Sequence, residues 1–261
     1  MISPQAVKAA LKQQAIHFFV DPQWVIPSII APFIFTTVTL FLFSHTGGDL
    51  LLYAVLGGGV LGMWGNTIQS SSWSIGFDRM NGTLEAIMVT PAPLASVVLG
   101  RCLWNSLLGL INALAVFIVA QFAFGIEVTL RDPLGFVLAL FLTLISLSVL
   151  GMVFGAFYVV TRASTALFQM LEFPVYVLSG AVFSLAILPE WTRPFSFAIP
   201  ATWGAEALKI SSFTNYDSFG LGLWGALAVT AFTTVIYLLL SIWLFGYLEK
   251  KAKVNGTLVR Y

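Results

Sequence analysis

The stretch Phe77-Asp78-Arg79-Met80-Asn81-Gly82-Thr83-Leu84-Glu85-Ala86-Ile87-Met88-Val89-Thr90-Pro91 is a polar island between two long apolar segments. Each flanking segment, 50–73 and 94–124, has the length of about 20 residues that a membrane-spanning helix needs. A polar segment with its own turn residues, placed between two membrane spans, has to lie outside the hydrocarbon. The sequence therefore predicts an exposed segment by which a partner in the aqueous phase can hold the membrane part.

The composition of the whole chain points the same way. Of its 261 residues 59% are hydrophobic and 9% are charged, whereas a soluble domain has roughly a quarter of its residues charged. We therefore expect an all-α integral membrane protein in contact with the lipid bilayer. The net charge of +1 provides no basic patch for nucleic acid, and the single cysteine, Cys102, excludes an internal disulfide.

Six segments are apolar and long enough to span a membrane, and they make one domain of residues 1–261. They are Trp24–Phe43, Leu50–Trp73, Leu94–Phe124, Pro133–Val160, Ala163–Leu188 and Phe219–Leu248. With the N-terminus in the cytoplasm, nine Lys or Arg residues fall on the cytoplasmic side and three, Arg131, Arg193 and Lys209, on the outer side. Basic residues favour the cytoplasmic side, so we expect a multi-pass protein of the cell inner (plasma) membrane with both termini in the cytoplasm.

Two further elements are predicted outside the spans. Residues 3–20 have apolar side chains at helical spacing (Val7, Leu11, Ala15 and Phe18), which predicts an amphipathic helix at the cytoplasmic interface. Residues 189–218 are too interrupted by proline to span and too apolar to be fully solvated, which favours an outer re-entrant helical hairpin. Within the spans, the pairs Gly58 with Gly62 and Gly151 with Gly155 predict close helix approach.

The sequence lacks the motifs that ATP binding, metal binding or catalysis would need. No Gly-x-x-x-x-Gly-Lys-Ser/Thr loop occurs, and His17 and His45 are predicted on opposite sides of the membrane, where they cannot share a metal. A membrane-embedded enzyme, for instance a lipid-modifying transferase, would need carboxylates or histidines clustered at one interface. Such a cluster is absent, so we expect neither catalytic nor metal-binding residues. A purely structural membrane protein has no evident reason to keep the polar island.

Polar residues inside the spans are few, and two interpretations of them stay open. Gln169, Glu172 and Tyr176 fall near one face of the fifth span, and Arg101, Asn105 and Asn112 form a similar line on the third. They are candidates for the lining of a transport path, because an intramembrane polar group favours a cavity or a polar partner. The alternative is hydrogen bonding between helices, with Arg101 at the cytoplasmic headgroups.

At this point the chain resembles the permease subunit of an ABC-2 type exporter. The pattern Asp78-Arg79-x-x-Gly82-Thr83-Leu84-Glu85, followed by Thr90-Pro91, is similar to the coupling-helix signature of that family. The segment 174–180 resembles the pattern of its fifth span, and 188–191 and 199–209 resemble its outer hairpin. The resemblance marks Pro189, Trp191, Pro200, Trp203 and Glu206 as hairpin residues. The order of these motifs matches along essentially the whole chain.

The resemblance implies a transport subunit that is not itself an enzyme. It implies two copies of a separate P-loop ATPase subunit, which hold ATP and Mg, and a second permease subunit, identical or homologous. It also implies a cytoplasmic coupling helix between spans two and three, and it marks Asp78, Arg79, Gly82, Thr83, Leu84 and Glu85 as the residues that couple to the ATPase. There Gly82 allows a turn, Thr83 can cap the helix, and Glu85 lies near its positive end.

The substrate is less closely defined. We expect ATP-driven export of an amphipathic, drug-like, peptide or lipidic substrate, because the interior is mainly apolar. Export of lipid-linked polysaccharide or teichoic acid is the alternative, since aromatic side chains stack on sugars. The abundant aromatic residues do not decide between the two, because membrane proteins also place them at interfaces.

Overall fold

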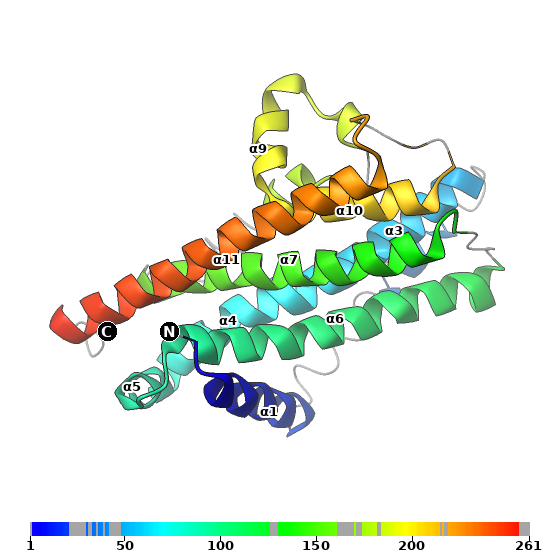
Figure 1. The fold of residues 1–261 in the computed structure, drawn as a ribbon. Helices are drawn as coiled ribbons and strands as arrows, with labels where there is room; N and C mark the ends of the chain where they lie inside the picture. Colours follow the sequence, from blue (N-terminus) through cyan, green and yellow to red (C-terminus); the bar gives the residue numbers. More distant parts are fainter. Residues whose placement is uncertain are drawn as a thin grey trace.

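The computed structural model describes residues 2–20, 30, 33–34, 36–38, 40–41, 48–125, 130–160, 170, 174–181, 184–214, 216 and 219–255. Within these ranges every regular element is a helix (Figure 1). The predicted all-α class is therefore confirmed for the described part of the chain. The first predicted span, 24–43, lies largely outside it, and of the fifth, 163–188, the structure describes residues 170, 174–181 and 184–188.

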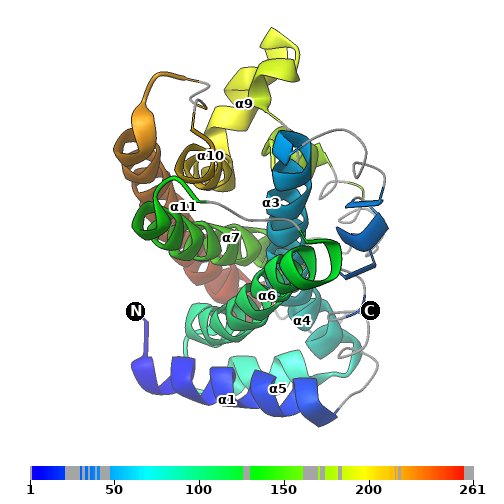
Figure 2. The ribbon, with the colours of Figure 1, turned by 90° about the vertical axis from the view of Figure 1, so that its right-hand side faces the viewer.

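In the described part of the chain, three helices are long and apolar enough to cross a membrane. They are α6 (Leu94–Phe124), α7 (Pro133–Val160) and α11 (Gly222–Asn255), and they coincide with the third, fourth and sixth predicted spans. Helix α7 lies at the centre of the bundle, with α6, α10 and α11 around it (Figure 2). Large apolar side chains on α11, such as Phe232 and Trp243, point away from the bundle and are exposed, as expected for a face that lipid covers.

The second predicted span is a helical run of three parts. It consists of α3 (Gly48–Trp64), a π-helical turn η1 (Gly65–Gln69) and α4 (Ser70–Met80). The wider turn interrupts the α-helical hydrogen bonding, so neither α-helix has the length of a span by itself. The periodicity of the sequence predicts a continuous apolar helix here and does not reveal the π turn.

The N-terminal helix α1 (Pro4–Val20) runs across the direction of α6, at the end of the bundle where α5 also lies (Figure 2). Phe18 of its predicted apolar stripe is buried, and the exposed residues Lys8 and Lys12 lie on another face. A Cβ atom at Gly100 of α6 would lie 2.3 Å from the carbonyl oxygen of Val7. A helix is therefore confirmed here, and its apolar stripe packs on α6.

In the described residues 184–214 there are four short helices, and the first of them lies inside the predicted fifth span, whose described α-helical residues end at 178. These are η2 (Leu185–Ile187), η3 (Glu190–Thr192), α9 (Arg193–Ala198) and α10 (Pro200–Ser212). Pro200 occupies the first turn of α10, where its missing N–H has no role. All 13 residues of α10 are buried, because this helix packs against α7 and α11. The hairpin is therefore built into the bundle through α10, while α9 stands out from it (Figure 1).

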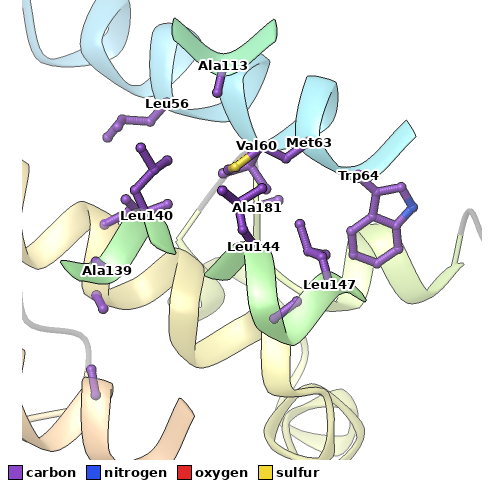
Figure 3. Packing of buried hydrophobic residues seen from close by; sticks show 14 of the residues in the cluster. Leu56, Val60, Met63, Trp64, Ala113, Ala139, Leu140, Leu144, Leu147 and Ala181 are labelled. Atoms are coloured by element: carbon purple, nitrogen blue, oxygen red, sulfur yellow. The ribbon is translucent and has the colours of Figure 1, made fainter. Parts of the chain in front are cut away.

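The main core joins α3, η1, α7 and α10, with further side chains from α6 and α11. Leu56 and Val60 of α3 lie on the side of Leu140 and Leu144 of α7, and Trp64 lies further along α3, on the side of Leu147 (Figure 3). In a bilayer such contacts stabilise by close packing rather than by removal of water, so small residues at the helix contacts matter. A Cβ atom at Gly151 would lie 3.0 Å from the carbonyl oxygen of Thr67, and one at Gly155 would lie 3.0 Å from Ile75 Cδ1. The predicted close approach is thus observed at this glycine pair.

Candidate functional site

The polar island folds into a short helix at one end of the bundle. Helix α4 ends at Met80, Gly82 adopts a left-handed conformation with φ 69°, and α5 (Thr83–Val89) begins at the next residue. Glycine adopts this conformation at little energetic cost, so it permits the sharp turn. The helix ends at Thr90, whose hydroxyl donates to the carbonyl of Ile87 at 2.6 Å. Within the segment 77–91, residues 77–80 thus belong to the end of α4, and residues 83–89 form a separate short helix.

Helix α5 has two different faces. Leu84 and Met88 are buried in a cluster with Ile75, Leu94 and other apolar side chains of α4, α6, α7 and α11. The opposite face is exposed and includes Glu85 and Val89, whose exposed fraction is 86%. One face therefore anchors the helix to the bundle, and the other is open to a partner.

An ion pair lies directly beneath this helix. Both guanidinium nitrogens Nη1 and Nη2 of Arg101 on α6 donate to the carboxylate of Asp78 on α4, the second at 3.3 Å to Oδ1. The exposed fractions of the two side chains are 4% and 13%. Nη2 also lies 3.4 Å from the amide oxygen of Gln13 on α1. Arg101 therefore joins α4, α6 and α1, and its side chain is buried among these helices.

Thr83 connects α5 to the same carboxylate. Its hydroxyl lies 3.0 Å from Asp78 Oδ1 and 3.2 Å from the Asp78 carbonyl oxygen. The expectation that Thr83 caps the helix is wrong, because the cap position is Gly82, without a side-chain hydrogen bond. The left-handed turn places Thr83 inside the first turn, with its hydroxyl directed back to α4. Polar contacts thus run from α5 through Asp78 and Arg101 to α1.

The rest of the predicted polar line on α6 is also buried. Asn105 donates to the Ser71 hydroxyl of α4 at 3.1 Å and accepts from the Gln14 amide of α1 at 3.5 Å. Asn112 is buried about two turns further along α6. For Arg101 and Asn105 the observed partners are neighbouring helices of the same chain. Their role in a transport path stays a prediction.

The candidates on the fifth predicted span are mostly unobserved. Gln169 and Glu172 lie outside the described residues. Tyr176 lies in the helical segment 174–178, and its ring meets Trp64 of α3 edge to face, with 5.1 Å between ring centroids. The side chain of Arg79 likewise lies outside what the structure describes.

At the opposite end of the bundle, α10 carries a buried ion pair that the sequence analysis did not single out. Lys209 Nζ lies 3.1 Å from Glu206 Oε1, and the exposed fractions of the two side chains are 2% and 1%. The hydroxyl of Tyr216 lies 2.9 Å from each oxygen of Glu206. The spacing of three residues in a helix could have indicated the pair, but not its burial.

The other predicted hairpin residues lie in or next to the short helices η3 and α10. Pro189 precedes η3, and Trp191 in η3 is exposed. The indole N–H of Trp203 donates to the carbonyl of Phe197 at 3.0 Å, and the two rings stack, so α10 holds α9. In the described ranges no three His, Cys, Asp or Glu side chains gather in a way that could hold a metal ion.

Comparisons with known proteins agree with this architecture. A family model described as ABC-2 type transporter matches residues 5–213. "ABC transporter G family member 20" from Dictyostelium discoideum is 22% identical over 222 residues. The match covers 84% of this chain and 30% of that relative, so the chain spans less than a third of its length. Because the family model covers well over half of the residues, from α1 through α10, this chain belongs to the ABC-2 type transporter family.

Proposed function

We propose that this chain is the membrane-spanning permease subunit of an ATP-driven exporter, with six spans and both termini in the cytoplasm. The observation that carries the proposal is α5. It is a separate helix at one end of the bundle, with Leu84 and Met88 buried and Glu85 and Val89 exposed. A rigidly anchored helix with an open face is suited to fit a cleft of another protein.

The partner in this proposal is a P-loop ATPase, in two copies that hold ATP and Mg. The family membership supports it, since the name of the Dictyostelium relative is that of an ABC transporter. That relative is more than three times as long as the match, so its remaining length leaves room for further domains. A second permease subunit, identical or homologous, completes the proposed assembly.

The contacts beneath α5 suggest how movement would be transmitted. A displacement of α5 pulls on Asp78 through Thr83, and Asp78 is held by Arg101 of α6. Arg101 is in turn close to Gln13 of α1. Motion of the ATPase would therefore move α4, α6 and α1 together rather than α5 by itself. Rocking of these helices would alternate access between the two sides of the membrane.

The cargo in this proposal is amphipathic, drug-like, peptide or lipidic. Apolar side chains dominate the contacts between α3, α7 and the segment 174–181, where Tyr176 lies beside Trp64. Such surroundings suit a substrate that enters from the membrane or its interface. Glu172 and Gln169 stay candidates for the path, with Asn105 and Asn112.

A purification experiment tests the proposal. The chain is tagged at its C-terminus, extracted from its native membranes in mild detergent and isolated, and the bound proteins are identified by mass spectrometry. We expect a P-loop protein in near-equal amount and ATP hydrolysis by the isolated complex. Recovery of well-folded permease with no P-loop protein, from several detergents and from lipid nanodiscs, would rule out the proposed assembly.

A further inference from the structure

The buried pair Glu206–Lys209 reaches beyond its own helix. Lys209 Nζ donates to the carbonyl oxygen of Gly180 at 2.5 Å. Gly180 has φ 64° and lies two residues after the helical residues 174–178. The N–H of the intervening Ser179 donates to the carbonyl of Val175 at 2.9 Å. The last carbonyls of a helix lack partners within it, and a cation there also interacts favourably with the helix dipole. Lys209 therefore holds the end of the helical segment 174–178, which is called the end of the fifth span below.

Tyr216 extends the same cluster. Its hydroxyl, besides contacting both oxygens of Glu206, lies 3.4 Å from the hydroxyl of Ser184. Its ring lies edge to face with Tyr53 of α3, with 6.1 Å between centroids, and Tyr53 stacks on Phe213. The cluster thus joins the end of the fifth span to α10, to α3 and to the segment that leads into α11.

A gain in stability does not by itself explain the presence of this buried ion pair. Burying two charges has a desolvation penalty that largely offsets their attraction, and apolar replacements of a buried pair are often neutral or stabilising. A buried pair is better explained where it fixes one arrangement against another. Here the carbonyl of Gly180 is the group whose position the charged pair fixes.

The geometry also permits release. Glu206 and Lys209 both belong to α10, so their contact persists if the segment 174–181 moves away. The bond from Lys209 to Gly180 crosses between the two segments, and breaking it leaves the ammonium still paired with Glu206. If the segment 174–181 moves away from α10, no unpaired charge is therefore left in the protein interior, where it would be costly. The bond between Lys209 and Gly180 can then break and form again.

We propose that Lys209, held by Glu206 and Tyr216, is a positioning residue that latches the end of the fifth span to α10. The latched segment contains Tyr176, so the latch sets where this candidate path residue lies against Trp64. The inference rests on the proposed function for its role in transport. The contact itself is tested without any partner protein.

The test uses thiol labelling in a Cys102→Ala background. Ser179→Cys reports on the latched segment, because Ser179 is buried directly before Gly180. Ser196→Cys in α9 is the matched control, because Ser196 is likewise buried and its hydroxyl donates to the carbonyl of Thr192 at 3.4 Å. Labelling of a buried thiol by a bulky maleimide measures local opening. Both reporters are combined with the neutral pair Glu206→Gln and Lys209→Met, which avoids an unpaired buried charge.

We expect the neutral pair to raise labelling at position 179 about tenfold or more and to leave position 196 unchanged. Lys209→Arg, which keeps a charged donor, should restore slow labelling at 179. Unchanged labelling at 179 in the neutral pair would overturn the latch. An equal rise at both positions would also overturn it, since the pair would then support the packing of the whole hairpin.

A second measurement addresses movement. In the purified complex with its ATPase, Mg-ATP should raise labelling of Ser179→Cys in the otherwise native chain, while Ser196→Cys stays slow. Constant labelling at 179 during ATP hydrolysis would show a fixed contact and overturn the latch as a moving part. This outcome differs from failure of the proposed function, in which no ATPase is recovered.

Discussion

Arg101 on α6 forms a bidentate ion pair with Asp78 on α4, 23 positions earlier in the chain. The pair is almost completely buried and lies under α5, which is attached to it through Thr83. Arginine suits this place because its planar fork matches both oxygens of a carboxylate and stays charged when buried. The end of the bundle that carries α5 is therefore held by charge as well as by apolar packing.

Asp78→Asn should destabilise the protein strongly. The substitution leaves Arg101 buried without its counter-charge, which costs about 3–5 kcal/mol in buried pairs, and the value should fall at the lower end because Asp78 keeps some exposure. Thermal unfolding in detergent should show a clear fall in Tm. Asp78→Glu retains the charge and should lower Tm much less. Equal Tm values for Asp78→Asn and the parent would show that the pair contributes nothing.

Glu85→Lys should leave the fold intact and remove the partner. Glu85 is exposed on α5 and no ion pair is observed for it within the described residues, so Tm should stay within experimental error. Reversal of a charge in a desolvated contact with the ATPase can cost a few kcal/mol of binding. Co-purification of the P-loop protein measures the loss. Glu190→Lys, an exposed reversal at the other end, is the control and should retain the partner in full.

Gly82→Ala should affect both stability and assembly. A residue with a Cβ atom pays about 1–2 kcal/mol in the left-handed conformation, and relief of this strain would turn α5 away from its position. Gly125→Ala is the matched control, because Gly125 has nearly the same φ of 64° and open space around it at the far end of α6. Both variants should lower Tm, but only Gly82→Ala should reduce recovery of the ATPase. Loss of the partner in both would contradict the assignment to α5.

Gly204→Val should disturb the packing of α10 against α7. A Cβ atom at this position would lie 2.4 Å from Thr143 Oγ1 of α7, so α10 has to move or Thr143 has to turn. Overpacking of this kind typically costs about 1–3 kcal/mol. Tm should fall accordingly, whereas Gly246→Ala in α11, with no atom within 4 Å, should be neutral or slightly stabilising. A neutral result for Gly204→Val would mean that the helices separate easily here.

Thiol accessibility should locate the two ends of the bundle. In a Cys102→Ala background, Ala86→Cys on α5 should react with an impermeant maleimide in inverted vesicles and stay protected in intact cells. Trp191→Cys in η3 should show the opposite pattern. Both positions are exposed, so access to the reagent depends on the side of the membrane. Labelling of Ala86→Cys in intact cells would invert the proposed topology.

The sequence by itself determined the helical class, the long apolar helices α6, α7 and α11, and the short helix at 83–89. These features depend on local properties, namely apolar length, proline and glycine breaks, and the polar island. It also led to the family, because the motif order extends over the whole chain. It did not predict the π turn at 65–69, which lies against α6 and α7.

The tertiary structure decided the partners of the polar residues. Arg101 and Asp78 are separated by a turn and a helix, and no local pattern shows that they meet in the protein interior. The sequence predicts Lys209 among the basic residues on the outer side of the membrane. In the structure it is buried with Glu206, because α10 packs between α7 and α11. Burial depends on which helices meet, and that is a property of the assembled bundle rather than of any segment. The charges in the sequence were therefore visible from the start, but their pairing required the fold.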